Sequence, residues 1–99
     1  MKEIIINDVK YIVKKDYNEA LNIEEIKSKM TDYFNNFDYI VGDWSYSKLR
    51  LKGFYESNNK NVKDINNINN LDNYLTNYCA YGCKYFVLKK DWNIFFCLL

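Results

Sequence analysis

Apolar and polar residues alternate in two runs in the middle of this chain, on either side of a short polar segment. In the run Leu49–Tyr55, leucine, glycine and tyrosine fall on one face, while arginine, lysine and phenylalanine fall on the other. This period of two is typical of a half-buried strand. The run Tyr39–Trp44 is also rich in aromatic and branched residues, and the connection Ser45–Lys48 has the length of a hairpin loop. We therefore expect a β-hairpin, in which Gly42 and Gly53 mark either a bend of the sheet or the close approach of another group.

Three further strands are predicted outside this hairpin. Glu3–Ile6 and Lys10–Lys14 lie on either side of Asn7 and Asp8, two residue types that tolerate the positive φ of a tight turn. The third strand, Lys84–Lys90, is built on a run of tyrosine, phenylalanine, valine and leucine. The chain therefore has about five strands.

Apolar residues at steps of three and four predict a first helix that runs to about Asn36. Asn22 is its expected N-cap, with Glu25 three positions later in a capping-box relation. The residues of the apolar stripe are Ile23, Ile26, Met30, Tyr33 or Phe34, and Phe37.

A second helix is expected after Asn70, with Gly82 placed to end it. The asparagine-rich segment 57–70 that precedes it reads as a surface loop, with a helical turn near Asp64 and with Ile65 and Ile68 as its anchors. The predicted fold class is therefore α+β: a mainly antiparallel or mixed sheet of about five strands, with two helices packed on one face. We expect residues 1–90 to form a single domain and the apolar tail 91–99 to be a docked segment or an extra strand.

The composition excludes several kinds of catalytic site and metal site. The chain has no histidine, which excludes Ser-His-Asp and Cys-His catalysis and every histidine-based metal site. The chain has three cysteines, an odd number, and no secretion signal is recognised. This favours free thiols in a reducing compartment over a framework of disulfides. We expect Cys79 and Cys83 to be metal-free, and we predict no cofactor, no membrane span and a cytoplasmic location.

Charge is unevenly distributed along the chain. Residues 1–44 hold six lysines and nine acidic residues, whereas residues 45–90 hold eight basic and three acidic residues. Arg50 is the only arginine, and its planar fork suits a bidentate contact with a phosphate or carboxylate. The candidate binding residues around it are Asp43, Trp44, Tyr46, Lys48, Arg50, Lys52 and Lys84.

Two main functions remain open for this set. Aromatic rings interleaved with cations suit single-stranded nucleic acid, so one expected partner is RNA or a ribonucleoprotein. The alternative is a protein partner, and a small enzyme that uses Asp43 with Arg50, or Asp38 with Asp43, is a weaker third reading. Asp43 and Arg50 can equally form an ordinary cross-strand ion pair, and the register of the hairpin decides whether they meet.

Three spaced blocks of this sequence resemble the YutD-like family. The blocks are Tyr39–Trp44, Leu49–Tyr55 and Tyr78–Lys90, and the resemblance covers roughly residues 3–90. It implies an α+β domain of a bacterial cytoplasm and brings no established activity, so no catalytic residue is carried over. The family often has glycines where this chain has Ser45 and Ser47, which argues against a very tight loop at that point.

Overall fold

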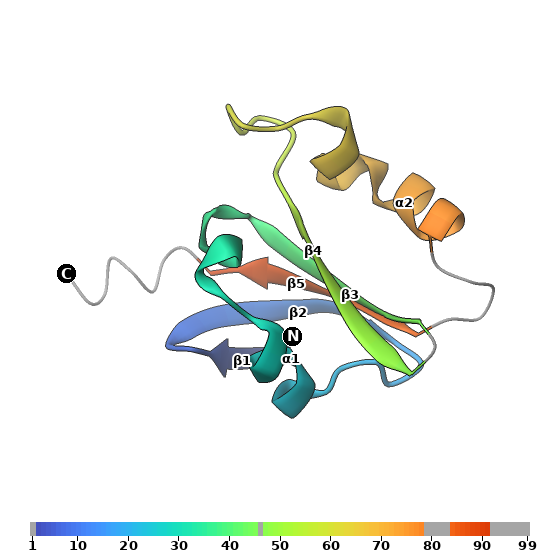
Figure 1. Cartoon of the computed structure of the whole chain (residues 1–99). Coiled ribbons are helices and arrows are strands. Elements are labelled where there is room, and N and C mark those ends of the chain that lie inside the picture. Colours follow the sequence, from blue (N-terminus) through green and yellow to red (C-terminus); the bar gives the residue numbers. More distant parts are fainter. Residues whose placement is uncertain (1, 46, 79–83, 92–99) are drawn as a thin grey trace.

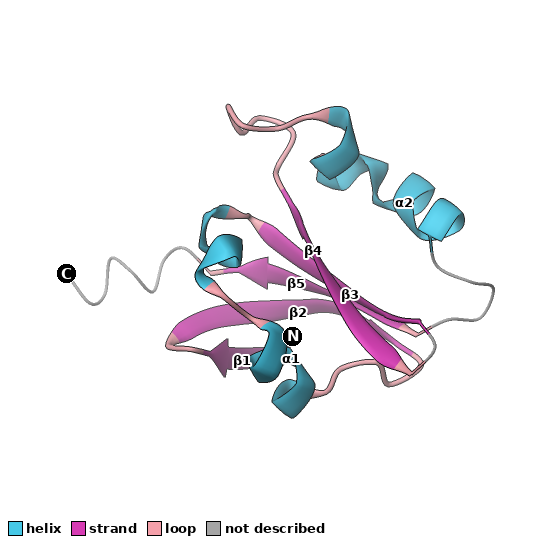
Figure 2. Cartoon of the chain, in the orientation of Figure 1, coloured by secondary structure: helices cyan, strands magenta, loops and turns pink. Residues whose placement is uncertain are grey.

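One antiparallel sheet of five strands forms the centre of the molecule (Figure 2). The computed structural model describes residues 2–45, 47–78 and 84–91. The strand order across the sheet is β1-β2-β5-β3-β4, and every neighbouring pair is antiparallel. The strands are Glu3–Ile6 (β1), Val9–Tyr17 (β2), Tyr39–Ser45 (β3), Lys48–Phe54 (β4) and Tyr85–Lys90 (β5). This sheet confirms the expected five-stranded α+β fold.

Both hairpins close through two-residue turns. Asn7 and Asp8 have φ values of 51° and 68°, so both central residues of the first turn adopt the left-handed conformation expected from the sequence. In the second hairpin Ser45 pairs with Lys48, and Ser47 has a φ of 65°. The second turn is therefore tighter than a loop without glycine suggested, because Ser47 adopts the backbone conformation that glycine adopts most easily.

The first predicted helix is interrupted. Helix α1 spans Ile23–Lys29, and the side chain of Asn22 accepts a hydrogen bond from the Glu25 N–H at 3.1 Å, as expected for its cap. Met30 is extended, and the chain resumes as the 3₁₀ helix η1, Asp32–Asn36. The expectation of one continuous helix to residue 36 was wrong, although the stripe still faces the core: Ile26, Met30, Phe34 and Phe37 are buried.

The asparagine-rich segment folds into two short 3₁₀ helices, Asp64–Asn66 (η2) and Ile68–Asn70 (η3), which lead into helix α2, Leu71–Tyr78. The Tyr55 N–H donates to the Asn66 carbonyl at 2.7 Å, and the Ile68 N–H donates to the Tyr55 carbonyl at 2.9 Å. Ile68 packs against the core, whereas Ile65 is 73% exposed and is not an anchor, contrary to expectation. No helix within the described ranges is long and apolar enough to cross a bilayer.

The two α-helices lie on opposite faces of the sheet (Figure 1), not on one face as the sequence suggested. One core cluster contains Ile40, Phe86 and Leu88 together with residues of α1 and η1. The other contains Val41, Phe54 and Val87, against which Leu71 and Tyr74 of α2 pack. Because successive strand residues point to opposite faces, Ile40 and Val41 require separate covers. We call these two sides the α1 face and the α2 face.

Glycine is needed at two positions on the α1 face. A Cβ atom on Gly42 would lie 2.1 Å from Cζ of Phe86, and one on Gly53 would lie 2.2 Å from Cγ of Phe37. The two glycines therefore mark the close approach of aromatic rings. Phe86 is fully buried, so its ring has little room to move.

Gly42→Ala should lower the free energy of unfolding by about 1–3 kcal/mol or more, because the added methyl group overlaps the Phe86 ring. Urea unfolding of wild type, Gly42→Ala, Phe86→Leu and the double variant measures the coupling. The alanine should cost less in the Phe86→Leu background, where the ring is gone. An equal cost in both backgrounds would show that the ring is not the reason for the glycine.

Candidate functional site

The structure divides the predicted binding residues between the two faces. Asp43, Lys48, Arg50 and Lys52 fall on the α2 face, because they alternate with buried residues of the α1 face along β3 and β4. Trp44 packs against the α1-face cluster, and its Nε1–H donates to the Ala20 carbonyl at 2.8 Å. The Lys84 ammonium lies over this Trp44 ring, 5.0 Å from its centroid. The predicted set is therefore not one surface.

Several residues that the sequence singled out lie outside the described ranges. They are Tyr46, Cys79, Gly82, Cys83 and the tail segment 92–99.

Asp43 and Arg50 are directly opposite each other in the β3–β4 register. Nη2 of Arg50 donates to Oδ2 of Asp43 at 2.5 Å, and the Asp43 carboxylate is buried while the Arg50 side chain is 44% exposed. The hydrogen bond to Asp43 raises the pKa of Arg50 above its ordinary value, with a smaller opposing effect of burial. A buried carboxylate thus orients an arginine that remains accessible at the surface.

Asp38, the other carboxylate considered for catalysis, has different partners. Its Oδ2 accepts hydrogen bonds from the Glu56 N–H at 2.8 Å and from Nδ2 of Asn59 at 3.1 Å. The neighbouring Lys90 is buried, and its Nζ donates to the Asn35 carbonyl. Burial lowers the pKa of Lys90, and the charge of Asp38 opposes that shift. These contacts connect η1, the end of β5 and the segment after β4, which is a structural role.

Lysine ammonium groups lie over aromatic rings across the α2 face. Lys52 is 5.4 Å from the ring centroid of Phe54 and 5.6 Å from that of Tyr74. Lys89 is 5.8 Å from the Tyr39 centroid, and Lys15 is 5.6 Å from the Tyr85 centroid. Each cation is attracted by the negative face of its ring. These four rings therefore each have a lysine ammonium of the chain over them, and the exposed Tyr17 ring of the same face is stacked on Tyr85.

We define the basic surface as Lys15, Lys48, Arg50, Lys52 and Lys89, all on the α2 face by strand alternation. Sequence reasoning missed Lys15 and Lys89. Their period in the sequence places each on one side of a strand, but only the strand order brings β2 and β5 alongside β3 and β4. An open groove of about 770 Å³ adjoins this surface between β4 and α2. Its lining residues are Lys52, Asp64, Ile65, Asn70, Asn73, Tyr74 and Asn77.

Comparison with known proteins finds similarity to YutD-like proteins in both sequence and structure. The model of a family described as "YutD-like: Putative antitoxin YutD-like" matches residues 5–89. A Bacillus subtilis (strain 168) protein named "Putative antitoxin YutD" is 40% identical over 87 residues, which are 88% of this chain and 96% of that protein. The solution NMR structure of protein yutD from B. subtilis superimposes with a TM-score of 0.77 at 38% identity, covering 93% of this chain and 84% of the other.

Asp43→Asn and Arg50→Gln should each lower the free energy of unfolding by about 1–3 kcal/mol, because each leaves a buried or partly buried polar partner without its opposite charge. The double variant Asp43→Asn/Arg50→Gln should lose less than the sum of the two single losses. Urea unfolding of the four proteins measures this. Strictly additive losses would show that the two groups do not stabilise each other.

Tyr39 gives a pH-dependent prediction. Burial, followed by the hydrogen bond that its hydroxyl donates to Oε1 of Glu56 and by the negative charges of Glu56 and Asp38, raises the pKa of Tyr39 to about 12. The folded state therefore disfavours the phenolate. Its contribution to stability is complete below the ordinary tyrosine pKa of about 10 and is lost as the pH rises from there toward 12.

Tyr39→Phe should flatten the fall in the free energy of unfolding between pH 10 and pH 12, measured by urea unfolding at several pH values. Tyr33→Phe is the matched control, because Tyr33 is 69% exposed. The same slope in wild type and Tyr39→Phe would contradict the assignment.

Proposed function

This chain belongs to the YutD-like family, and from that premise we propose that it is a protein-binding module whose basic surface engages an acidic partner protein. The observation that carries the proposal is the arrangement of cations across β2, β5, β3 and β4 on one face. Such a field attracts acidic groups and raises their rate of association. The surface is built on strands, so its charges have fixed spacing.

The lysine–ring contacts favour a protein over RNA as the partner. Single-stranded nucleic acid is bound by stacking bases on open aromatic faces while cations follow the phosphates. Here Lys52, Lys89 and Lys15 lie over the rings of their own face, and Trp44 is on the other side of the sheet. Among the described residues, the remaining exposed ring of this face, Tyr17, is stacked on Tyr85. Charges beside rings that already have partners suit carboxylates better than bases.

The name of the Bacillus subtilis relative points in the same direction. The word antitoxin in "Putative antitoxin YutD" implies a partner that is counteracted. A partner of this kind bound by the present chain would meet the basic surface through its own acidic residues.

Two variants with the same change in net charge test the proposal. Lys15→Gln/Lys52→Gln/Lys89→Gln removes three cations of the basic surface, whereas the control Lys2→Gln/Lys27→Gln/Lys29→Gln removes three exposed cations elsewhere. Each full-length protein is immobilised and exposed to lysate of its source cells, with and without nuclease, and captured proteins are quantified by mass spectrometry. We expect the first variant to lose capture about tenfold, equivalent to about 1.4 kcal/mol, and the control to retain it.

The variant Arg50→Lys is a third sample in the same capture experiment. It keeps the positive charge at position 50 and loses the planar guanidinium group that can contact a carboxylate or phosphate through two hydrogen bonds. Capture that nuclease abolishes would assign the surface to RNA. Equal capture by both triple variants would show that net charge, not this surface, governs binding.

A further inference from the structure

In the part of the chain that the structure describes, the outer edge of β4 is a row of backbone groups with no strand beside it. β4 is at the end of the strand order. Immediately after it, both the N–H and the carbonyl of Tyr55 bond to the segment Asn66–Ile68, on the side away from β3. Backbone direction alternates with a period of two, so every second residue of β4 projects its N–H and carbonyl the same way. These residues are Leu49, Leu51 and Gly53.

Only the end of this edge is covered by the part of the chain that the structure describes. The Tyr55–Asn67 bridge is parallel and stops at that point. Within residues 2–45, 47–78 and 84–91, no other segment forms a hydrogen bond to the outer side of Leu49, Leu51 or Gly53. Among the described residues, an extended segment thus already pairs with this edge at Tyr55, and no segment pairs with the outer side of residues 49–53.

The two sides of this edge differ in chemistry. On the α2 face, Lys48, Arg50 and Lys52 follow one another at every second position, and Asp43 orients Arg50. On the α1 face, Leu51 is half-buried beside Leu49 and Gly53.

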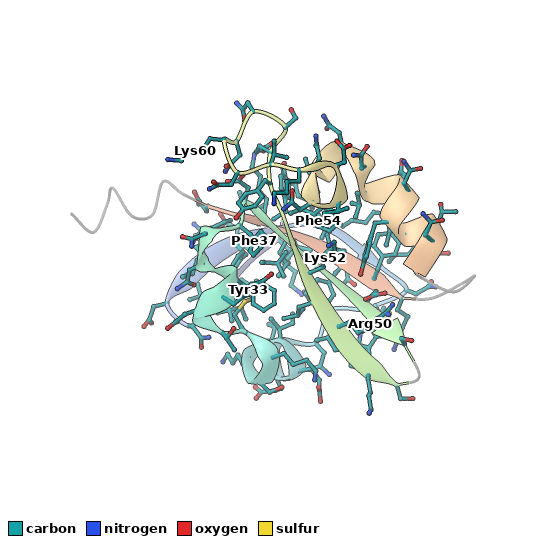
Figure 3. The ribbon with its side chains drawn as sticks, turned by 45° about the horizontal axis from the view of Figure 1, so that its top comes forward. Tyr33, Phe37, Arg50, Lys52, Phe54 and Lys60 are labelled. Atoms are coloured by element: carbon teal, nitrogen blue, oxygen red, sulfur yellow. The ribbon has the colours of Figure 1, made fainter. Side chains whose placement is uncertain are left out.

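Aromatic rings extend this apolar side. Phe37 lies on Gly53, its ring centroid is 4.8 Å from that of Tyr55, and the exposed ring of Tyr33 is 5.4 Å from Phe37. Figure 3 shows Tyr33 and Phe37 on one side of β4 and Arg50 on the other.

We propose that the outer edge of β4 binds an extended segment of an acidic partner protein as a sixth strand, in which acidic residues alternate with apolar ones. This proposal rests on the proposed function, since it names how the acidic partner docks. In such a strand the acidic side chains lie beside Lys48, Arg50 and Lys52, and the apolar side chains lie beside Leu51 and the aromatic rings. Main-chain hydrogen bonds supply affinity, and the alternating side chains supply specificity.

Charge disfavours a second copy of this chain as the occupant. If two β4 strands paired antiparallel about Arg50, the two Arg50 side chains would be opposite each other and Lys48 would be opposite Lys52. Like charges directly opposite each other destabilise a strand pair. Edge lysines are a common protection against self-association, and here they select an acidic strand.

A synthetic peptide tests the proposal on the full chain. The probe has three glutamates that alternate with two valines between terminal serines, and the control has the same composition with its glutamates adjacent. Amide signals of ¹⁵N-labelled protein are followed by NMR. With the alternating probe, the amides of Leu49, Leu51 and Gly53 should shift and exchange with solvent about tenfold more slowly. The control peptide should leave their exchange unchanged.

Two methylated probes separate strand addition from simple charge attraction. One is N-methylated at the glutamates and the other at the valines, so each lacks the N–H groups of one side of the peptide. One of the two should lose binding and the other should keep it, because a paired strand bonds through alternate residues.

Equal binding of both methylated probes, with unprotected edge amides, would overturn strand addition while leaving a charge-driven protein module intact. Failure of every glutamate peptide to bind would count against the proposed function as well. Sedimentation equilibrium without peptide should give a monomer, and a dimer that protects the same three amides would assign the edge to a second copy.

Discussion

Burial of β3 and β5 on both faces is the constraint on which the rest of the structure depends. Consecutive residues of these strands, Ile40 with Val41 and Val87 with Leu88, are buried against different clusters. Each face therefore needs its own cover, α1 with η1 on one side and α2 on the other. The rings of Phe86 and Phe37 fit onto the α1 face only because Gly42 and Gly53 leave room for them.

The basic surface follows from this two-sided burial. The residues of the α2 face that are not buried include Lys15, Lys52 and Lys89, whose ammonium groups lie over rings of the same face. The contacts of Lys52 with Phe54 and Tyr74 belong both to the core and to the surface. Cation–π contacts thus orient Lys15, Lys52 and Lys89, of which Lys89 also pairs with Glu56 at 3.6 Å, and Asp43 orients Arg50.

The same strand order sets β4 apart from the strands beside it. β2, β5 and β3 are paired on both edges, whereas β4, like β1 at the opposite end of the sheet, pairs with a strand on one edge in the part of the chain that the structure describes. Lys48, Arg50 and Lys52 therefore lie both on the basic surface and along an edge that can extend the sheet. A single strand, β4, therefore presents both cations that can attract acidic side chains and backbone groups that can pair with another strand.

Much of the fold could be read from the sequence. Alternation at 49–55, the Asn7–Asp8 turn, the Asn22 cap and the apolar run in β5 identified the five strands and the start of α1, because these signals are local and depend on neighbouring residues. The uninterrupted apolar runs in β3 and β5 are typical of strands that are buried on both faces. They therefore argued against the expectation that both helices pack on one face of the sheet.

The tertiary structure decided which distant residues come together, and no local sequence pattern encodes this. The β3–β4 register brought Asp43 to Arg50, the strand order joined Lys15 and Lys89 to the basic surface, and the alternation about Trp44 moved it and Lys84 away from that surface. The sequence by itself determined which residues alternate and where the chain turns. Which faces and edges then meet depends on contacts between segments far apart in the chain, because a one-residue change of register would move every side chain to the opposite face.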